Sequence, residues 1–430
     1  MASVESSNGS IERQPRVLEG REQDAVLHTN GSRKSRDMEG CADLNQWIVS
    51  ALEQVHCQRP IIVKEEIMKD VLGHMCSICR IHLTWPSGLS DLPSTVIAKI
   101  PNTTSLLEKF RENSDDQVSF AEDNDDFFLR MVHETETDIY TMFSREHCEG
   151  LAMPFFYGAQ PFSSPWPCIL IEDIHSSKTV DVVDGFNDDE LYQIVDQLVA
   201  LHVYSHTHDE WKVISEKSIR CGLEDTESCQ QFLKMIVSMI EHLRSTYPQL
   251  SESLLLLHEN FTKNMSWFAE RLRYYRDKEV LRTFVHGDLW AANILWRNNK
   301  LAAIVDWALC HPGSLTEDLQ RVLVTSCSVD RRLRMTPILL RYYFKQMQIK
   351  MSERNIEVPF TFEDLEDDYY RTLPYTCGQT VFAVGFWLRT NVIRKSKSDD
   401  ETRVLEMVAR LHSVVEEAIA THNWHHTNNI

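Results

Sequence analysis

The fold is decided by one stretch of twelve residues, Val285-His286-Gly287-Asp288-Leu289-Trp290-Ala291-Ala292-Asn293-Ile294-Leu295-Trp296. Within it, Asp288 lies five residues before Asn293, and apolar residues enter and leave the polar centre. This is the layout of a phosphotransferase catalytic loop, in which the Asp accepts a proton from an attacking hydroxyl and the Asn amide oxygen binds a magnesium ion. The spacing therefore predicts Asp288 as the catalytic residue and Asn293 as a metal ligand.

A second strand is expected after this loop. The turn Arg297–Lys300 leads into the apolar run Leu301–Val305, which ends on Asp306, thirteen residues after Asn293. A kinase places its second metal ligand at such a position. Magnesium takes few protein ligands and leaves its remaining positions to phosphate and water. One amide and one carboxylate, from Asn293 and Asp306, are therefore a plausible predicted set of protein ligands.

Each of these residues also has an ordinary structural explanation. Asp288 suits a helix cap or a turn, Asn293 suits a turn, and Asp306 is where a strand ends. Any one of them alone is a weak signal. Their order, with both aspartates at junctions of strand and loop, favours phosphotransfer over the structural explanation.

The same region resembles the CHK kinase-like family, which includes ecdysteroid 22-kinase-like enzymes and nematode proteins of the DUF1679 type. That family is related to choline kinases and aminoglycoside phosphotransferases. The residues that carry the resemblance are His286-Gly287-Asp288-Leu289-Trp290, Asn293, Val305-Asp306-Trp307, Gly313 and Glu317-Asp318-Leu319-Gln320-Arg321. The resemblance extends from about residue 45 to about residue 420, and only 284–322 is specific on its own. It implies an α+β, two-lobed protein-kinase-like fold, with a small β-rich N-lobe and a larger helical C-lobe.

The resemblance also implies roles in the front half of the chain. Lys99, within the β-branched run Thr95–Ile100, matches the lysine that holds the α- and β-phosphates of ATP. Glu136, four residues before Tyr140, matches the helix glutamate that pairs with that lysine. Taken alone, Lys99 is equally well explained as an exposed lysine on an edge strand. Glu136 is then one more carboxylate on an acidic helix, with Glu134 as a competitor.

The segment Glu172-Asp173-Ile174 follows the apolar run Cys168–Ile171 and resembles the hinge between the lobes of such kinases. At a hinge of this kind the backbone carbonyl of Glu172 and the backbone amide of Ile174 would bind the adenine edge. An ordinary exit from a strand is the alternative.

The chain departs from the family pattern at two places. The piece that matches the phosphate-covering turn, Leu72–Ser77, has one glycine, and loss of glycine restricts the approach of backbone amides to phosphate. Ala308 stands two residues after the metal-binding Asp, where the family commonly has Gln. Both predicted metal ligands remain, so the sequence favours a competent kinase and leaves a pseudokinase open.

Three polar residues near the loop are expected to be structural. Asp318 lies near a helix start, where it would cap the helix or brace the catalytic loop by accepting backbone hydrogen bonds. Arg321 is expected to be structural as well, and His286 to orient the loop rather than to move protons.

Composition narrows the class of protein further. The 430 residues carry a formal net charge of −20, which argues against non-specific binding to nucleic acid or to anionic membranes. The sequence has no apolar run of the ~18 residues that a membrane span needs, and its amino terminus does not resemble a signal peptide. The eleven cysteines are an odd number, which favours free thiols, with the pair Cys76 and Cys79 as structural residues. A cytoplasmic protein is expected.

The pattern of the chain predicts three parts. Residues 1–40 are polar and without apolar period, which predicts a disordered tail. Residues 41–174 are rich in strands and are predicted to form the ATP-binding N-lobe. Residues 175–425 are predicted to form the helical C-lobe, with the catalytic loop in 284–311. After residue 188, helical periods run through 188–201, 229–247, 251–275, 316–325, 334–349 and 402–420.

Together these observations predict an ATP- and Mg-dependent small-molecule kinase. It would transfer the γ-phosphoryl group of ATP to a hydroxyl of a small organic molecule, and the resemblance implies a sterol-, glycoside- or xenobiotic-like alcohol. No obligate protein partner is inferred. One alternative is a choline- or ethanolamine-type kinase, which needs an anionic and aromatic cage for its amine. Candidate cage residues in the helical lobe are Phe382, Phe386, Trp387, Glu363 and Asp367. The other alternative is a catalytically weak binding protein of kinase fold.

Overall fold

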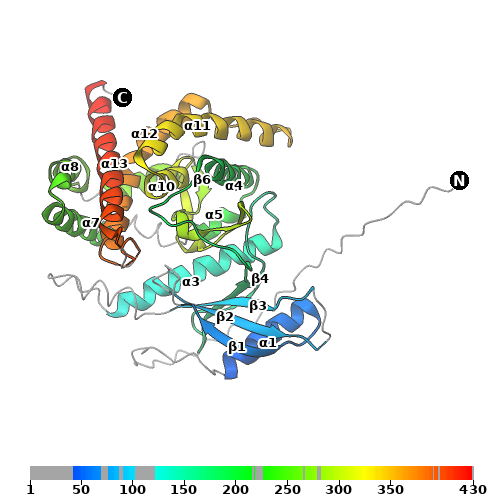
Figure 1. Cartoon of the computed structure of the whole chain (residues 1–430). Helices are drawn as coiled ribbons and strands as arrows, with labels where there is room; N and C mark the ends of the chain where they lie inside the picture. Colours follow the sequence, from blue (N-terminus) through cyan, green and yellow to red (C-terminus); the bar gives the residue numbers. More distant parts are fainter. Residues whose placement is uncertain are drawn as a thin grey trace.

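The computed structural model separates a β-containing lobe from a larger helical lobe (Figure 1). The predicted tail 1–40 and most of the glycine turn 72–77 lie outside the residues that it describes. The described residues are 42–68, 76–86, 91–101, 122–215, 217, 226–264, 267–277, 282–390, 392–395 and 398–428.

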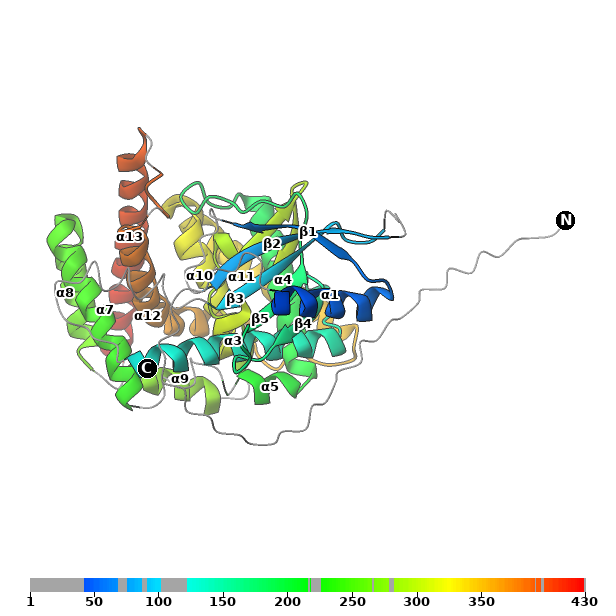
Figure 2. The ribbon, with the colours of Figure 1, turned by 90° about the horizontal axis from the view of Figure 1, so that it is seen from below.

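The smaller lobe is built on an antiparallel five-stranded sheet with the order β1-β2-β3-β5-β4. Helix α1 (Ala42–His56) packs on one face of this sheet, and Figure 2 shows it from below. The strands are β1 (Ile61–Ile67), β2 (Cys76–Thr84), β3 (Thr95–Pro101), β4 (Phe156–Gln160) and β5 (Cys168–Glu172).

Alternation along β3 decides where its lysine points. Val96, Ala98 and Ile100 face the small core under α1. Because successive strand side chains point to opposite faces, Lys99 faces the other way, toward the helical lobe. Ile97, which has the same parity, packs on the large core of the helical lobe. The sequence alternation therefore places Lys99 at the boundary between the lobes.

Helix α3 (Glu122–Arg145) runs between the sheet and the helical lobe (Figure 1). It packs against β4 and against the short turn η4 (Trp307–Leu309), which comes from far along the chain. Ile139 and Tyr140 belong to the large core, so the inner face of α3 is buried between the two lobes. Glu136 lies on this inner face and is 1% exposed.

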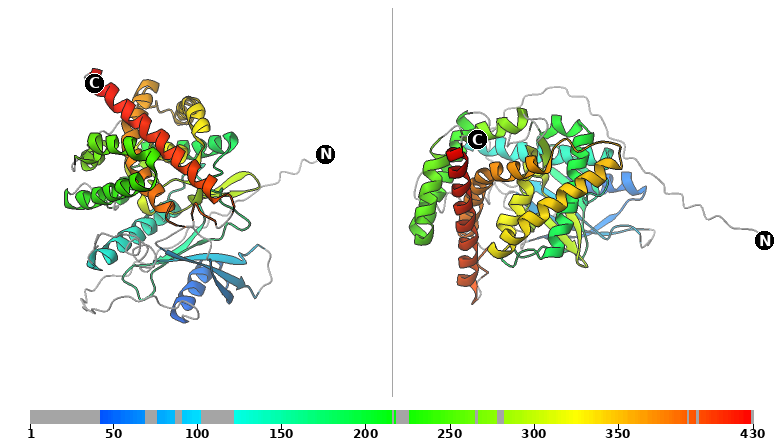
Figure 3. Two further views of the ribbon diagram at one scale, coloured as in Figure 1. Left: turned by 60° about the vertical axis from the view of Figure 1, so that its left-hand side comes forward. Right: turned by 90° about the horizontal axis from the view of Figure 1, so that it is seen from above.

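The helical lobe surrounds α12 (Phe362–Trp387), which is buried on all sides over most of its length. Helices α7 and α13 pack on α12, and α11 packs on α4 (Figure 3). The other helices are α4 (Asp188–Thr207), α5 (Glu210–Ser215), α7 (Thr226–Thr246), α8 (Ser251–Leu257), α9 (Trp267–Asp277), α10 (Glu317–Ser326), α11 (Val329–Ser352) and α13 (Asp400–Asn428). The short turns are η1 (Pro248–Leu250), η2 (His258–Thr262) and η3 (Ala291–Asn293).

Two small antiparallel ladders frame the loop predicted to be catalytic. Strand β6 (Arg282–Val285) pairs with β9 (His311–Ser314), and β7 (Ile294–Arg297) pairs with β8 (Lys300–Ile304). Asn298 and Asn299 form the turn that connects β7 to β8, and their φ angles are positive, at 54° and 60°. Such two-residue loops match the right-handed twist of the flanking strands.

The predicted two-lobed, protein-kinase-like α+β fold is confirmed by this arrangement. One expected helix is not continuous, because 251–275 divides into α8, the π-type turn η2 and α9. Among the described residues, none of the helices combines the length and the hydropathy that a bilayer crossing needs.

Candidate active site

One buried carboxylate binds the backbone of the loop between β6 and η3. Asp318, in the first turn of α10, accepts hydrogen bonds from the backbone amides of His286 (2.7 Å) and Gly287 (2.9 Å). Burial raises the pKa of Asp318 to about 6, although both amides favour its charged form. The expected bracing role of Asp318 is therefore present in the structure.

Gly287 makes the close turn of this loop possible. Its φ angle is +78°, and an added Cβ atom would collide with the backbone oxygen of Leu309. Only glycine adopts such a conformation without a steric penalty and without occupying that space. The turn brings Asp288 out of the strand and toward the boundary between the lobes.

His286 joins the two loops that carry the predicted site residues. Its Nε2 lies 3.0 Å from the backbone oxygen of Val305, and its Nδ1 lies 3.3 Å from the backbone nitrogen of Asp288. A carbonyl oxygen only accepts, so Nε2 carries the proton and Nδ1 accepts from the amide of Asp288. The imidazole thus orients both loops, as expected from the sequence.

A hydrogen bond to the backbone of Asp288 fixes the side-chain orientation of Asn293. Nδ2 donates to the backbone oxygen of Asp288 at 2.9 Å, and the backbone oxygen of Asn293 accepts from the amide of Val305 at 3.0 Å. Since Nδ2 has this partner, the side-chain oxygen Oδ1 is the atom left to meet a cation. The backbone bond to Val305 also brings Asn293 next to Asp306, the residue that follows.

Three charged side chains from three distant segments meet where the lobes face each other. Lys99 Nζ lies 2.5 Å from Glu136 Oε2 and 2.6 Å from Asp306 Oδ1. Asp306 has a left-handed backbone, with φ 69° and ψ 60°, which is uncommon for a residue with a side chain. The formal charges of Lys99, Glu136 and Asp306, one positive and two negative, add to −1. The expected pairing of Lys99 with Glu136 is present.

Burial and mutual attraction perturb all three groups. Burial lowers the pKa of a lysine, but Asp306 and Glu136 together raise the pKa of Lys99 well above its ordinary value. Burial raises the pKa of Glu136 to about 7 against the attraction of Lys99. Lys99 keeps the pKa of Asp306 below its ordinary value despite burial. Clusters of such perturbed groups are typical of functional sites.

The donor set fits a hard divalent cation. Asn293 supplies an amide oxygen, Asp306 supplies a carboxylate, and magnesium prefers oxygen ligands of these types. The local formal charge of −1 around Lys99 leaves a cation favoured at this point. These two residues are therefore the ones that would hold magnesium.

The hinge segment keeps its side chains toward the protein. Glu172 Oε2 accepts from the backbone amide of Phe155 at 3.0 Å, and Asp173 binds the guanidinium of Arg80 at 2.6 Å. Ile174 is 7% exposed. With the side chains engaged in this way, the backbone of Glu172 and Ile174 is the part of the segment suited to the adenine edge.

Sequence reasoning missed one direct partner of Asp288, the predicted catalytic residue. Arg321 Nη2 lies 2.8 Å from Asp288 Oδ1, and the arginine side chain is 8% exposed. Arg321 follows Asp318 by three residues on α10, so the two share a helix face. That spacing was the available signal: the first residue holds the loop backbone, and the second holds the loop carboxylate.

The residues predicted to form a cage for a quaternary amine do not all come together in the structure. Glu363 and Asp367 lie in the first two turns of α12, whereas Trp387 ends the same helix. Twenty residues of helix separate Asp367 from Trp387, which corresponds to about 30 Å. Phe382 instead packs its ring against Phe232 of α7.

Comparison with known proteins gives one family match. The profile of the family described as "Uncharacterized oxidoreductase dhs-27" (DUF1679) matches residues 63–426. The protein of that name from Caenorhabditis elegans is 25% identical over 291 residues, covering 64% of this chain and 34% of its own length. This chain therefore spans about a third of that relative. "Uncharacterized kinase-like protein D1044.1" from the same nematode is 22% identical over 307 residues, covering 69% of this chain and 75% of its own length.

Two solved structures illustrate the structural likeness. Choline kinase from Cryptosporidium parvum has a TM-score of 0.49 and 10% identity, covering 84% of this chain and 92% of its own. The gentamicin complex of APH(2")-IIa has a TM-score of 0.43 and 14% identity, covering 87% and 98%.

Proposed function

This chain belongs to the DUF1679 family, and we propose that it is an ATP- and Mg-dependent phosphotransferase acting on a hydroxyl group of a small organic molecule. The observation that carries the proposal is the position of Lys99, whose amino group bridges Glu136 and Asp306 at 2.5 and 2.6 Å. A lysine fixed in this way, beside a carboxylate that follows a strand, is the arrangement that kinases use for nucleotide phosphates.

Each side chain then has a stated task. Lys99 would bind the α- and β-phosphates, with Glu136 holding the lysine in place. Asn293 and Asp306 would hold magnesium, which when bound neutralises charge on the β- and γ-phosphates. The backbone of Glu172 and Ile174 would bind the adenine edge.

Asp288 would orient the acceptor hydroxyl and take its proton. The acceptor oxygen forms a bond to the γ-phosphorus as the bond from that phosphorus to the β–γ bridging oxygen breaks, and ADP leaves with the bridging oxygen. Little covalent chemistry falls to the protein, so positioning and charge stabilisation account for most of the acceleration. The resemblance of the sequence suggests a sterol-, glycoside- or xenobiotic-like alcohol as acceptor.

The oxidoreductase name of one relative gives no competing proposal for this chain. That name belongs to a protein of which this chain covers 34%. No two glycines of the sequence are separated by a single residue, so the G-x-G-x-x-G turn of dinucleotide-binding folds is absent. All the paired strands of the described residues are antiparallel, whereas that fold uses a mostly parallel sheet.

The test is to incubate the purified full chain with Mg·ATP and a broad metabolite extract, and to search by mass spectrometry for species that gain one phosphoryl group. Asp288→Asn is the inactive variant, and Asp209→Asn is its matched control, because Asp209 is 85% exposed and outside the site. The proposal expects products with the wild type and with the control, and at least 100-fold less with Asp288→Asn. Equal products from Asp288→Asn would overturn it.

A further inference from the structure

The carboxylate proposed to receive the acceptor hydroxyl already has a permanent positive charge beside it. Arg321 reaches Asp288 Oδ1 at 2.8 Å, with side-chain exposures of 8% for the arginine and 23% for the aspartate. Within the part of the chain that the structure describes, this aspartate is the ionic partner of Arg321, and the Nε and Nη1 atoms of the arginine are buried without a hydrogen bond. The positive charge is therefore fixed at the acceptor side of the loop.

The neighbouring aromatic surface is also occupied by protein groups. The ring of Trp387 stacks on that of Trp290, with 4.4 Å between centroids and 24° between planes. The guanidinium carbon of Arg321 lies 5.6 Å from the centroid of the Trp387 ring. Both contacts use the π surface of Trp387, which is the surface that a quaternary ammonium group needs for cation–π attraction.

Carboxylates on the adjoining segment are paired with arginines. The loop before α4 reaches the end of α10, where the amide of Phe186 donates to the oxygen of Ser326 at 2.8 Å. On that loop Asp181 binds Arg403 at 2.8 and 2.9 Å. Asp184 on the same loop lies 4.0 Å from Arg403 and its side chain is 77% exposed, so solvent screens its charge. Because Arg403 balances Asp181 and water screens Asp184, this segment adds little net attraction for a cation.

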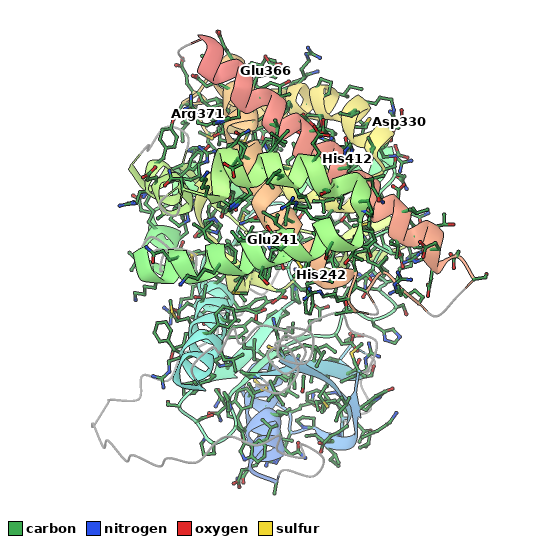
Figure 4. The ribbon with its side chains drawn as sticks, turned by 90° about the vertical axis from the view of Figure 1, so that its left-hand side faces the viewer. Glu241, His242, Asp330, Glu366, Arg371 and His412 are labelled. Carbon is green, nitrogen blue, oxygen red and sulfur yellow. The ribbon has the colours of Figure 1, made fainter. Side chains whose placement is uncertain are left out.

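A second arginine increases the positive character of the end of α12. Arg389 follows Trp387 by two residues, and its pKa is lowered by burial. The pKa of His242 on α7 is lowered mainly by burial and, to a smaller extent, by the charge of Arg389. Figure 4 shows His242 on the side of α7 nearest the β-containing lobe.

We propose that Arg321, held between Asp288 and Trp387, is a specificity-determining residue that makes this site select against cationic alcohols. The inference rests on the proposed phosphotransfer and concerns the charge of its acceptor. A hydroxyl that approaches Asp288 brings its substituents close to the guanidinium. A positively charged substituent is repelled there, whereas an uncharged one of the same shape is not.

The test uses two acceptors of equal shape: choline and its neutral carbon isostere, in which a tert-butyl group replaces the trimethylammonium group. Both are added at equal concentration, with Mg·ATP, to the extract reaction, and their phosphorylated products are measured as a ratio. Arg321→Met removes the charge at similar length, and Arg321→Lys retains it. The ratio does not depend on the fraction of folded or active protein, so it separates specificity from a structural loss.

The proposal expects the wild type and Arg321→Lys to favour the neutral isostere. It expects Arg321→Met to shift the product ratio toward choline by roughly 30- to 100-fold, which is the effect of removing one of two like charges about 6 Å apart. Equal or preferred use of choline by the wild type would overturn the charge selection and leave phosphotransfer intact. An unchanged ratio in Arg321→Met would overturn the role of the arginine alone. Absence of any phosphorylated species with the wild type would remove the proposed function itself.

Discussion

The amino group of Lys99 lies 2.6 Å from the carboxylate of Asp306, and this contact joins the middle of the N-lobe sheet to the end of β8. The two residues are 207 positions apart. Glu136 holds the same amino group from α3 at 2.5 Å. In the proposed function, a phosphate chain that enters here would meet the lysine, and a cation that accompanies it would meet the aspartate.

Replacing Lys99 by methionine should lower ATP turnover roughly 10²–10³-fold, because one preorganised charge is lost from the phosphate site. Turnover is measured as ADP release with the phosphorylated acceptor. Lys64→Met on β1 is the matched control, since that side chain is 59% exposed and pairs with Glu66. Full activity of Lys99→Met would contradict the phosphate role of the lysine.

Replacing Gly287 by alanine should destabilise the protein by about 1–3 kcal/mol and reduce turnover. The positive φ and the nearby Leu309 oxygen leave no room for a Cβ atom. Gly378→Ala is the control, because its added Cβ would meet Ile236 at an ordinary distance of 3.9 Å within a helix. Denaturant unfolding should show that this second change is neutral or slightly stabilising. Equal losses in both variants would refute the explanation.

Asp318→Asn should weaken the loop without unfolding the lobe. The carboxylate accepts from two backbone amides, and an amide side chain has one oxygen to offer in its place. We expect a loss of about 1–3 kcal/mol in unfolding free energy, as for a buried donor left without its partner. Turnover should fall by a larger factor than expression or solubility. Unchanged turnover and unchanged stability would show that the brace is dispensable.

Glu136→Gln should change how stability depends on pH. Burial raises the pKa of Glu136 to about 7 in the folded protein, from an ordinary value of 4.5. Between these values the folded protein binds more protons than the unfolded chain, so the Glu136 contribution to stability is present at low pH and lost as pH rises toward 7. Relative to the wild type, the variant should therefore gain stability from pH 4.5 to 7, on the order of 1–3 kcal/mol. Urea unfolding at both pH values measures this gain, and a difference between the two proteins that stays constant with pH would exclude it.

The local elements around the site could be predicted from sequence because their signals are local. The turn Arg297–Lys300 and the apolar runs on each side predicted a hairpin, and the structure has β7 and β8 joined there. The expected brace by Asp318 rested on its position near a helix start and on the family resemblance, because the two amides that it binds lie 32 and 31 positions earlier in the chain. The two-lobed fold followed from the change of pattern along the chain, from strands to helical periods.

The stacked pair of Trp290 and Trp387, near Asp288, could not be predicted in the same way. Trp290 meets Trp387, a residue almost a hundred positions away, and no periodic pattern links the two. The same holds for the break in 251–275, where the apolar period continues through the π-type turn His258–Thr262. Contacts of this kind depend on how helices pack, and the pattern of one segment does not contain them.

The nucleotide and metal site is tested most directly by a calorimetric titration of ATP into the wild type and into Asp306→Asn, once with magnesium and once with a chelator in its place. Magnesium should strengthen ATP binding to the wild type by at least about tenfold, or 1.4 kcal/mol. Asp306→Asn should lose most of this difference, because the carboxylate that would hold the cation is gone. Equal ATP affinity with magnesium and with chelator in the wild type, or an undiminished magnesium effect in the variant, would contradict the nucleotide and metal site proposed for Lys99 and Asp306.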